Sequence, residues 1–377
     1  MSPLQKQLQG MIEREGPISL AQFMACALYD PISGYYASGR ARIGKSGDFY
    51  TNVSIGPLFG KLLARQFIEM WTLMGAPAEW TLIEQGAFDG QLARDVLDAL
   101  LEQSLDCYRA TTLLLIEPFA FFAGAQRALL ARHASKTRWS PSLESCPPFT
   151  GVHYSNELLD AFPAHRVRRT QGNWVELRIG FSGEQFYWME TEISDPAVAR
   201  AVDRLSEPVE GAVREVCPLH QDWLTDLSVK LENGWILICD YGLSEQELAL
   251  PHRAAGTLTA YRNHRRSNCA LEEPGCQDIT YQVNFSDIIR LGNENGLQLV
   301  ASTDQSRFLT GVAPLHFKDS QAPLSKEQQK EALAFRSLTH PQLLGSKFKT
   351  LIFSKNRPSL ESIAGGRYAG QRNRVET

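Results

Sequence analysis

The fold is decided by the stretch Trp80-Thr-Leu-Ile-Glu-Gln-Gly-Ala-Phe-Asp-Gly90. Its first four residues predict a short buried strand, and residues 91–101 carry apolar side chains at helical spacing. A strand that ends in an acid and is followed by glycines and the start of a helix is typical of a loop that binds a nucleotide cofactor. The same pattern also fits a tight strand-to-helix turn that needs two glycines only for its geometry.

Apolar runs and helical patterns alternate along much of the chain. Short buried strands that alternate with helices indicate a parallel sheet covered by helices on both faces, so we predict a doubly wound α/β fold. The further predicted strands are 111–116, 151–154, 235–239, 297–301 and 348–353, and the predicted helices of this region include 57–74 and 121–133.

The expected organisation is one such domain with an N-terminal cap and two insertions. Ser19 is predicted to cap the second of two short N-terminal helices. The expected parts are a helical cap with a cofactor-covering loop (1–55), the first part of the core (56–162), a β-hairpin and helical insertion (163–233), the second part of the core (234–356) with a polar substrate loop (244–284), and a disordered tail (357–377).

Composition excludes several classes of protein. The 377 residues include 38 Lys+Arg and 42 Asp+Glu, and the net charge of −4 gives no general attraction to nucleic acid. The apolar run at 113–116 is far too short to cross a membrane, so we expect no membrane insertion. The seven cysteines form no CxxC pair, which argues against a zinc site or disulfide framework. With no secretory pattern at the start, the expected location is cytoplasmic.

Polar residues follow two other predicted strands. Glu117 ends the second strand, where an acid can accept hydrogen bonds from both hydroxyls of an adenosine ribose, although a solvated residue before Pro118 is the alternative. Asn156, Glu157 and Asp160 follow the fourth strand, and two carboxylates on one turn of helix could hold a cationic nitrogen. The alternative is a helix capped by Asn156 with acids in its first turn.

At this point the chain resembles a known family. The MidA-like methyltransferases, which include the mitochondrial complex I assembly-factor arginine methyltransferase, carry similar motifs in the same order. The resemblance covers roughly residues 5–355 and implies a seven-stranded, Rossmann-like class I methyltransferase sheet with an antiparallel last hairpin. The motifs are Gly47-Asp-Phe-Tyr-Thr51, the loop at 84–90, Asn156-Glu-Leu-Leu-Asp-Ala-Phe-Pro163, Asp240-Tyr-Gly242 and Gly275-Cys-Gln-Asp-Ile-Thr280.

The resemblance implies S-adenosylmethionine as the cofactor and assigns residues to it. Glu117 would bind the ribose and Asn156 would lie near the sulfonium, while the methionine end would meet the loop after the first strand. One departure is Phe88, which stands where the mitochondrial member has a glycine. The complete set of cofactor-binding candidates is Asp48, Thr51, Glu84, Gly86, Asp89, Gly90, Glu117 and Asn156.

The resemblance also implies a protein arginine as the methyl acceptor, and a subunit of a larger complex is one candidate for the acceptor protein. A guanidinium keeps its proton at neutral pH, so carboxylates must hold it and accept charge as the proton leaves. Glu157 and Asp160 are the catalytic candidates. Asp240, His264 and Asp278 are the substrate-binding candidates, with a simple turn residue as the alternative for Asp278.

Two other functions stay open at the level of sequence. Phe88 favours an assembly factor or chaperone that binds S-adenosylmethionine without turnover. A nicotinamide oxidoreductase would need a third glycine for the pyrophosphate, and Asp89 instead puts an anion-repelling acid at the helix start. Methyl transfer itself requires no metal, and we expect none.

Overall fold

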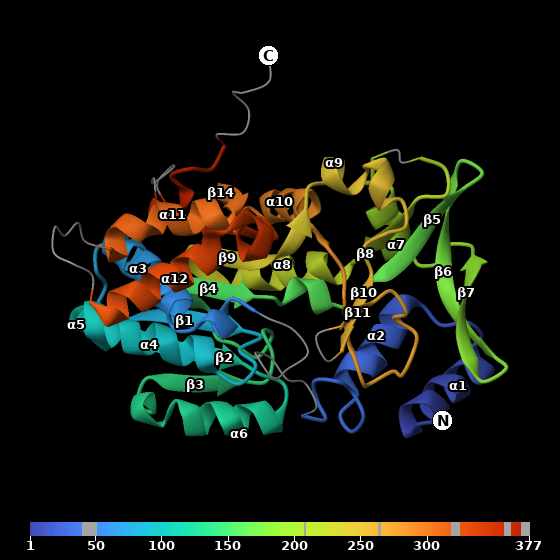
Figure 1. Cartoon of the computed structure of the whole chain (residues 1–377), viewed down its shortest axis with the longest axis horizontal. Helices are drawn as coiled ribbons and strands as arrows, with labels where there is room; N and C mark the ends of the chain where they lie inside the picture. Colours follow the sequence, from blue (N-terminus) through green and yellow to red (C-terminus); the bar gives the residue numbers. More distant parts are fainter. Residues whose placement is uncertain (40–50, 207–208, 263–264, 318–324, 358–362, 371–377) are drawn as a thin grey trace, which may run out of the picture. The chain divides into compact units, whose positions relative to one another are not determined.

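The computed structural model describes residues 1–39, 51–206, 209–262, 265–317, 325–357 and 363–370 (Figure 1). The chain forms two compact units, each assembled from three segments. The core unit comprises Thr51–Leu158, Leu224–Tyr241 and Gly292–Thr377, and the accessory unit comprises Met1–Tyr50, Leu159–Trp223 and Gly242–Leu291.

The core unit contains a sheet of seven strands in the order β14-β15-β9-β4-β1-β2-β3. β15 is antiparallel to both of its neighbours, and the other strands all run in one direction. This order confirms the predicted doubly wound α/β sheet with an antiparallel last hairpin. The strands are β1 (Trp80–Gln85), β2 (Thr111–Ile116), β3 (Thr137–Ser140), β4 (Phe149–Asn156), β9 (Leu231–Leu243), β14 (Gln298–Asp304) and β15 (Phe348–Lys355).

Helices cover both faces of this sheet. The main hydrophobic core lies between alternate strand residues, such as Leu82 and Val152, and the apolar faces of α3, α4 and α11. On the other face, Gly292 at the end of α10 lies against the ring of Phe353, where a Cβ would come within 2.6 Å of a ring carbon. The helices are α3 (Leu58–Leu73), α4 (Gln91–Gln103), α5 (Leu105–Ala110), α6 (Ala120–Leu129), α8 (Leu219–Lys230), α10 (Phe285–Glu294), α11 (Gln305–His316) and α12 (Lys326–Thr339). Residues 219–223 of α8 and 285–291 of α10 belong to the accessory unit.

Every strand predicted from an apolar run is present, with boundaries that differ by a few residues. β3 was not predicted, because Thr137-Arg-Trp-Ser140 is a four-residue edge strand without an apolar run. Such a strand needs apolar residues on one face only, so its sequence resembles that of a loop.

A row of close backbone contacts crosses the middle of the sheet. Gly151 of β4 is in register with Thr81 of β1 on one side and with Gly234 of β9 on the other. A Cβ on Gly151 would lie 1.9 Å from the carbonyl oxygen of Thr81, and a Cβ on Gly234 would lie 1.9 Å from that of Gly151. Both glycines also have positive φ, at 148° and 137°. Only glycine fits at these two positions.

The accessory unit contains two antiparallel sheets, in the orders β7-β6-β5-β8 and β11-β10-β12. Residues 163–190 form the predicted hairpin pattern, with turns at Gly172 and Gly183, and β8 extends that sheet. The short strand β13 pairs with the last two residues of β9. The strands are β5 (His165–Thr170), β6 (Asn173–Ser182), β7 (Gln185–Thr191), β8 (Val213–Val216), β10 (Thr259–Arg262), β11 (Arg265–Ser267), β12 (Asp278–Thr280) and β13 (Val283–Asn284), and the helices are α1 (Pro3–Glu15), α2 (Leu20–Tyr29), α7 (Pro196–Val202) and α9 (Glu245–Leu248).

The two N-terminal helices belong to this accessory unit. Ser19 caps α2 as predicted: its hydroxyl accepts a hydrogen bond from the backbone N–H of Gln22, whose side chain accepts one from the Ser19 N–H in return. Ile18 exchanges two backbone hydrogen bonds with Ile179 of β6, and Phe23 packs edge-on against Phe186 of β7. The cap is therefore tied to the four-stranded sheet.

Two regions differ from expectation. The polar segment 244–284 was expected to be a loop, but it contains the three-stranded sheet, whose strands are only three or four residues long. In the tail expected to be disordered, the described residues 363–370 include a short 3-10 helix. Its Ile363 and Ala364 are buried, and the Gly365 N–H donates to Gln66. The tail lacks a long apolar run, yet small residues let it pack closely on α11, where a Cβ on Gly311 would lie 2.1 Å from the Ala364 carbonyl oxygen.

The glycine row predicts a strong effect of one added methyl group. Gly151→Ala should lower the free energy of unfolding by roughly 2–4 kcal/mol, because the new Cβ meets a backbone carbonyl that cannot move freely. Gly124→Ala on α6, where no atom lies within 4 Å of the added Cβ, is the control and should change stability by less than about 1 kcal/mol. Urea unfolding measures both, and equal midpoints for the two variants would contradict this account.

Candidate functional site

Four parallel strands of the core unit place polar side chains at one edge of the sheet. Glu84 lies near the end of β1, Glu117 directly follows β2, Asn156 ends β4, and Asp240 lies near the end of β9. Because these strands are neighbours and parallel, their carboxyl ends form a single edge, the usual ligand-binding edge of such a sheet. We call it the carboxyl edge.

The loop after β1 depends on its glycines for two reasons. Gly86 and Gly90 both have positive φ, at 78° and 86°. Added Cβ atoms would lie 3.1 Å from Leu158 Cδ1 and from Gln126 Cγ, respectively. The exposed Asp89 caps the helix start, since its carboxylate accepts a hydrogen bond from the Gln91 N–H at 3.0 Å.

Phe88 occupies this loop in a left-handed conformation, with φ at 48°. A non-glycine residue is strained in that region, whereas glycine is not. The Phe88 ring packs against Phe122 of α6, with the ring centroids 4.9 Å apart. Phe88 thus holds a strained backbone conformation and contributes an aromatic contact with α6.

Glu117 is held by a residue that sequence reasoning missed. One carboxylate oxygen accepts from the Phe119 N–H at 2.8 Å, and the other accepts from the Gln126 side chain at 3.0 Å. The same Gln126 nitrogen also donates to the Phe88 carbonyl at 2.8 Å. Gln126 therefore joins the ends of β1 and β2. Burial raises the pKa of Glu117 to about 7.

Glu84 lies deeper in the sheet. It is buried, and the Tyr154 hydroxyl donates to its carboxylate at 2.7 Å. Burial raises the pKa of Glu84 to about 8, although the hydrogen bond from Tyr154 favours the charged form. Tyr154 was not among the predicted site residues, because an apolar or aromatic residue within a buried strand is normally assigned to packing alone.

Asn156 lies in a chain of side-chain hydrogen bonds within the core unit. Its side-chain nitrogen donates to Glu157 at 2.9 Å, and its side-chain oxygen accepts from Asn52 at 3.0 Å. Asn52 is fully buried and follows Thr51, one of the predicted cofactor-binding residues. Thr51 is itself buried, and its N–H donates to the Ser54 hydroxyl at 3.2 Å.

Asp240 is fully buried, and each of its carboxylate oxygens accepts a backbone hydrogen bond. The donors are the N–H of Leu158 at 3.0 Å and the N–H of Tyr241 at 2.8 Å. These bonds fasten the chain after β4 to the end of β9. This geometry favours an anchoring role for Asp240 over the predicted contact with substrate.

Glu157 and Asp160 do not share one turn of helix, contrary to the sequence-based expectation. Glu157 has a left-handed φ of 56°, and a three-residue 3-10 helix begins only at Leu159. Glu157 belongs to the core unit, where its N–H donates to the Cys239 carbonyl at 2.9 Å, and Asp160 belongs to the accessory unit. The spacing of side chains along the sequence does not report the backbone conformation of a single residue. It therefore could not show that Glu157 is left-handed.

Asp160 instead shares its surroundings with Asp278. Both carboxylates are buried in the accessory unit. Burial is the largest cause of the raised pKa of Tyr29, Tyr36 and Tyr261, and the negative charges of both carboxylates raise it further. The Tyr36 hydroxyl donates to Asp278 at 2.8 Å, and the rings of Tyr29 and Tyr36 stack with centroids 5.6 Å apart. We call these five residues the Asp–Tyr cluster.

Two predicted residues, Asp48 and His264, lie outside the described residues, as do residues 47–50 of the N-terminal motif. In the part of the chain that the structure describes, no helix is long and apolar enough to cross a membrane. The same described ranges contain no group of three or more His, Cys, Asp or Glu side chains that could hold a metal ion.

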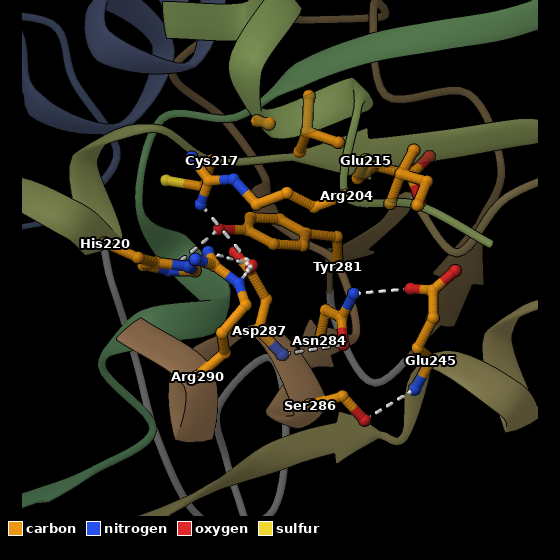
Figure 2. A pocket seen from close by; sticks show the side chains of 13 residues that line it. Arg204, Glu215, Cys217, His220, Glu245, Tyr281, Asn284, Ser286, Asp287 and Arg290 are labelled. Atoms are coloured by element: carbon orange, nitrogen blue, oxygen red, sulfur yellow. Dashed lines mark hydrogen bonds and ion pairs between the residues drawn. The ribbon is translucent and has the colours of Figure 1, made fainter. Parts of the chain in front are cut away.

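A separate pocket lies within the accessory unit (Figure 2). The Asp287 carboxylate of α10 forms ion pairs with the guanidinium groups of Arg290 at 2.7 Å and Arg204 at 3.6 Å. The Tyr281 hydroxyl lies 3.3 Å from His220 Nε2. Burial lowers the pKa of His220 to about 4, so the ring is neutral near pH 7. None of the predicted site residues lines this pocket.

The raised pKa of Glu84 predicts how stability depends on pH. The folded value of about 8 exceeds the ordinary value of 4.5, so the folded state binds more protons between these values. The free energy of unfolding is therefore highest below about pH 4.5 as far as Glu84 is concerned, and that contribution is lost as the pH rises to about 8. Glu84→Gln should reduce the loss of stability between pH 5 and pH 8 in urea unfolding. Glu79→Gln, at an exposed position, should follow the wild type, and equal slopes for all three proteins would contradict the prediction.

Known proteins resemble this chain in sequence and in structure. Residues 62–303 match a family described as "Putative S-adenosyl-L-methionine-dependent methyltransferase". A Drosophila melanogaster protein named Protein arginine methyltransferase NDUFAF7 homolog, mitochondrial, is 28% identical over 92% of this chain and 84% of its own length. The human protein arginine methyltransferase NDUFAF7, mitochondrial, is 24% identical over 99% and 87%.

A crystal structure from Burkholderia thailandensis with bound S-adenosyl-homocysteine has a TM-score of 0.85 and 26% identity. It covers 97% of this chain and 95% of that one. The prediction of a cytoplasmic location is wrong by these comparisons, because the relatives from fly, cattle and human are all named mitochondrial. The resemblance to MidA-like methyltransferases and the choice of S-adenosylmethionine as cofactor are confirmed. The chain belongs to the family of S-adenosyl-L-methionine-dependent methyltransferases.

Proposed function

We propose that this methyltransferase transfers the methyl group of S-adenosylmethionine to an arginine side chain of a protein. The names of the fly and human relatives support this acceptor. The observation that carries the proposal is the Asp–Tyr cluster, in which Asp160 and Asp278 are buried, the Tyr36 hydroxyl donates to Asp278 at 2.8 Å, and the rings of Tyr29 and Tyr36 stack. That the acceptor is a subunit of a larger complex stays a prediction.

The residues of the carboxyl edge suit the cofactor. The loop of Gly86 and Gly90 brings backbone close to the sheet edge, and Glu117 ends the strand where a ribose is usually held. Asn156 and Asn52 add amide groups beside that loop. Bound S-adenosylmethionine supplies a methyl group on a positively charged sulfur, which makes its carbon open to attack by a nitrogen lone pair. Thr51, Glu84 and Asp89 remain cofactor-binding candidates of the same edge.

The acceptor requires anionic groups that stay charged and hold a planar cation. A guanidinium binds carboxylates through paired N–H groups and stacks on aromatic faces. Asp160 and Asp278 supply the carboxylates in this proposal, and the half-buried rings of Tyr29, Tyr36 and Tyr261 supply the faces. Glu157 belongs to the core unit, and a catalytic role for it stays a prediction.

The reaction is a displacement in which one bond replaces another. A terminal guanidinium nitrogen forms a bond to the methyl carbon as the bond from carbon to sulfur breaks, leaving S-adenosylhomocysteine. The nitrogen then loses a proton to a carboxylate. Holding the two reactants in line and excluding water account for most of the acceleration in such a reaction.

Asp160 and Asp278 provide the test of this acceptor. Purified protein is incubated with tritium-labelled S-adenosylmethionine and a protein extract from cells that lack the gene, and the hydrolysed products are separated to detect methylarginine. Asp160→Asn and Asp278→Asn should each lower methylarginine formation about a hundredfold or more, because each removes a charge that holds the acceptor. Their affinity for S-adenosylmethionine, measured by calorimetry, should stay within about twofold of the wild type.

Asp203→Asn is the matched control, since Asp203 lies in the same unit at an exposed position. It should methylate like the wild type. Label in lysine rather than arginine would contradict the proposed acceptor. A wild-type protein that binds the cofactor and labels nothing would favour the non-catalytic assembly factor instead.

A further inference from the structure

Asn52 carries a side-chain oxygen whose orientation is fixed by its neighbours. Glu157 can only accept hydrogen bonds when charged, so the Asn156 side chain must turn its nitrogen toward that carboxylate. The Asn156 oxygen then faces Asn52, which in turn must present its own nitrogen. The Asn52 Oδ1 atom is thereby directed away from this chain of hydrogen bonds.

That oxygen is buried without a donor. Asn52 is fully buried, and its Oδ1 accepts no hydrogen bond from any of the described residues. A buried acceptor in this condition is rare in native proteins, because it loses its hydrogen bonds to water and gains nothing in return. The Thr51–Ser54 hydrogen bonds fold this segment into a turn, and the bond to Asn156 holds the Asn52 amide. The oxygen is set to receive a donor from a ligand.

The strand order narrows the choice of donor. Ser155 of β4 is in register with Gln85 of β1, so Asn156 lies beside the start of the Gly86 loop. Glu117, the proposed ribose partner, follows β2 on the opposite side of β1. Asn52, bonded to Asn156, is thus on the side of the loop away from the ribose. On that side the cofactor offers one strong donor, the α-ammonium of its methionine part.

We propose that Asn52 is a cofactor-binding residue whose Oδ1 atom accepts a hydrogen bond from the α-ammonium of S-adenosylmethionine. Asn156 and Glu157 act on the cofactor through it, by fixing the direction of its amide. The inference rests on the cofactor alone, so it holds or fails independently of the arginine acceptor, and its test measures binding rather than methyl transfer.

The affinities for three ligands distinguish this contact from a general effect of the substitution on the cofactor site. S-adenosylmethionine and S-adenosylhomocysteine both carry the α-ammonium, and 5′-methylthioadenosine lacks the whole amino-acid end. By isothermal titration calorimetry, Asn52→Leu should weaken the first two about tenfold or more, as expected for a lost hydrogen bond to a charged group. It should leave the affinity for 5′-methylthioadenosine within about twofold of the wild type.

Asn233→Leu is the matched control. Asn233 also has a buried Oδ1 without a partner among the described residues, but it lies near the start of β9, opposite Thr150 at the other edge of the sheet. It should bind all three ligands like the wild type. Asn52→Ala, which removes the amide without adding apolar bulk, is measured with the same ligands in case the leucine variant does not fold.

Two results would overturn the proposal. An equal loss of affinity for all three ligands would mean that Asn52 maintains the shape of the cofactor site and does not contact the ammonium. Unchanged binding of S-adenosylmethionine to the alanine variant would exclude the contact altogether.

Discussion

The parallel pairing of β1 with β4 and of β4 with β9 is the constraint on which the rest of this protein depends. It brings Glu84, Asn156 and Asp240 to a single edge although the chain separates them widely. At Gly151 and Gly234 a Cβ would collide with a carbonyl oxygen of the neighbouring strand, so the pairing requires glycine there. Asp240 also stabilises this edge, because its carboxylate accepts two backbone hydrogen bonds that hold the segment after β4 against the end of β9. The glycine loop after β1 and the left-handed Glu157 both lie at that edge. So do the hydrogen bonds that join Asn52, Asn156 and Glu157.

Much of the fold could be predicted because the core strands are short apolar runs between helices. The exceptions have physical reasons. The edge strand β3 needs no continuous apolar run, and β10, β11 and β12 are too short and polar to show a period. Residues 363–370 pack through close contacts of small residues on α11, which leave little trace in hydrophobic spacing.

Candidate site residues could be predicted where the end of a strand determines their location, as for Glu84, Glu117 and Asn156. It was not predictable where tertiary contacts decide it. Gln126 reaches Glu117 and the Phe88 carbonyl from a helix, and nothing in the helix period distinguishes it from a surface residue. Asp160 lies close to the end of β12, which carries Asp278, because the Tyr281 N–H donates to the Asp160 carbonyl, whereas chain proximity suggested Asp160 with Glu157. Asn52 carries no motif, and only its burial and its hydrogen-bond geometry single it out.

We expect the carboxyl edge of this sheet to bind S-adenosylmethionine. The most direct test is calorimetric titration of the purified wild-type protein with S-adenosylmethionine and, separately, with NADH. The account predicts micromolar binding of S-adenosylmethionine and no heat of binding from NADH, because Asp89 opposes a pyrophosphate at the start of α4. Binding of NADH alone, or of neither ligand, would contradict it.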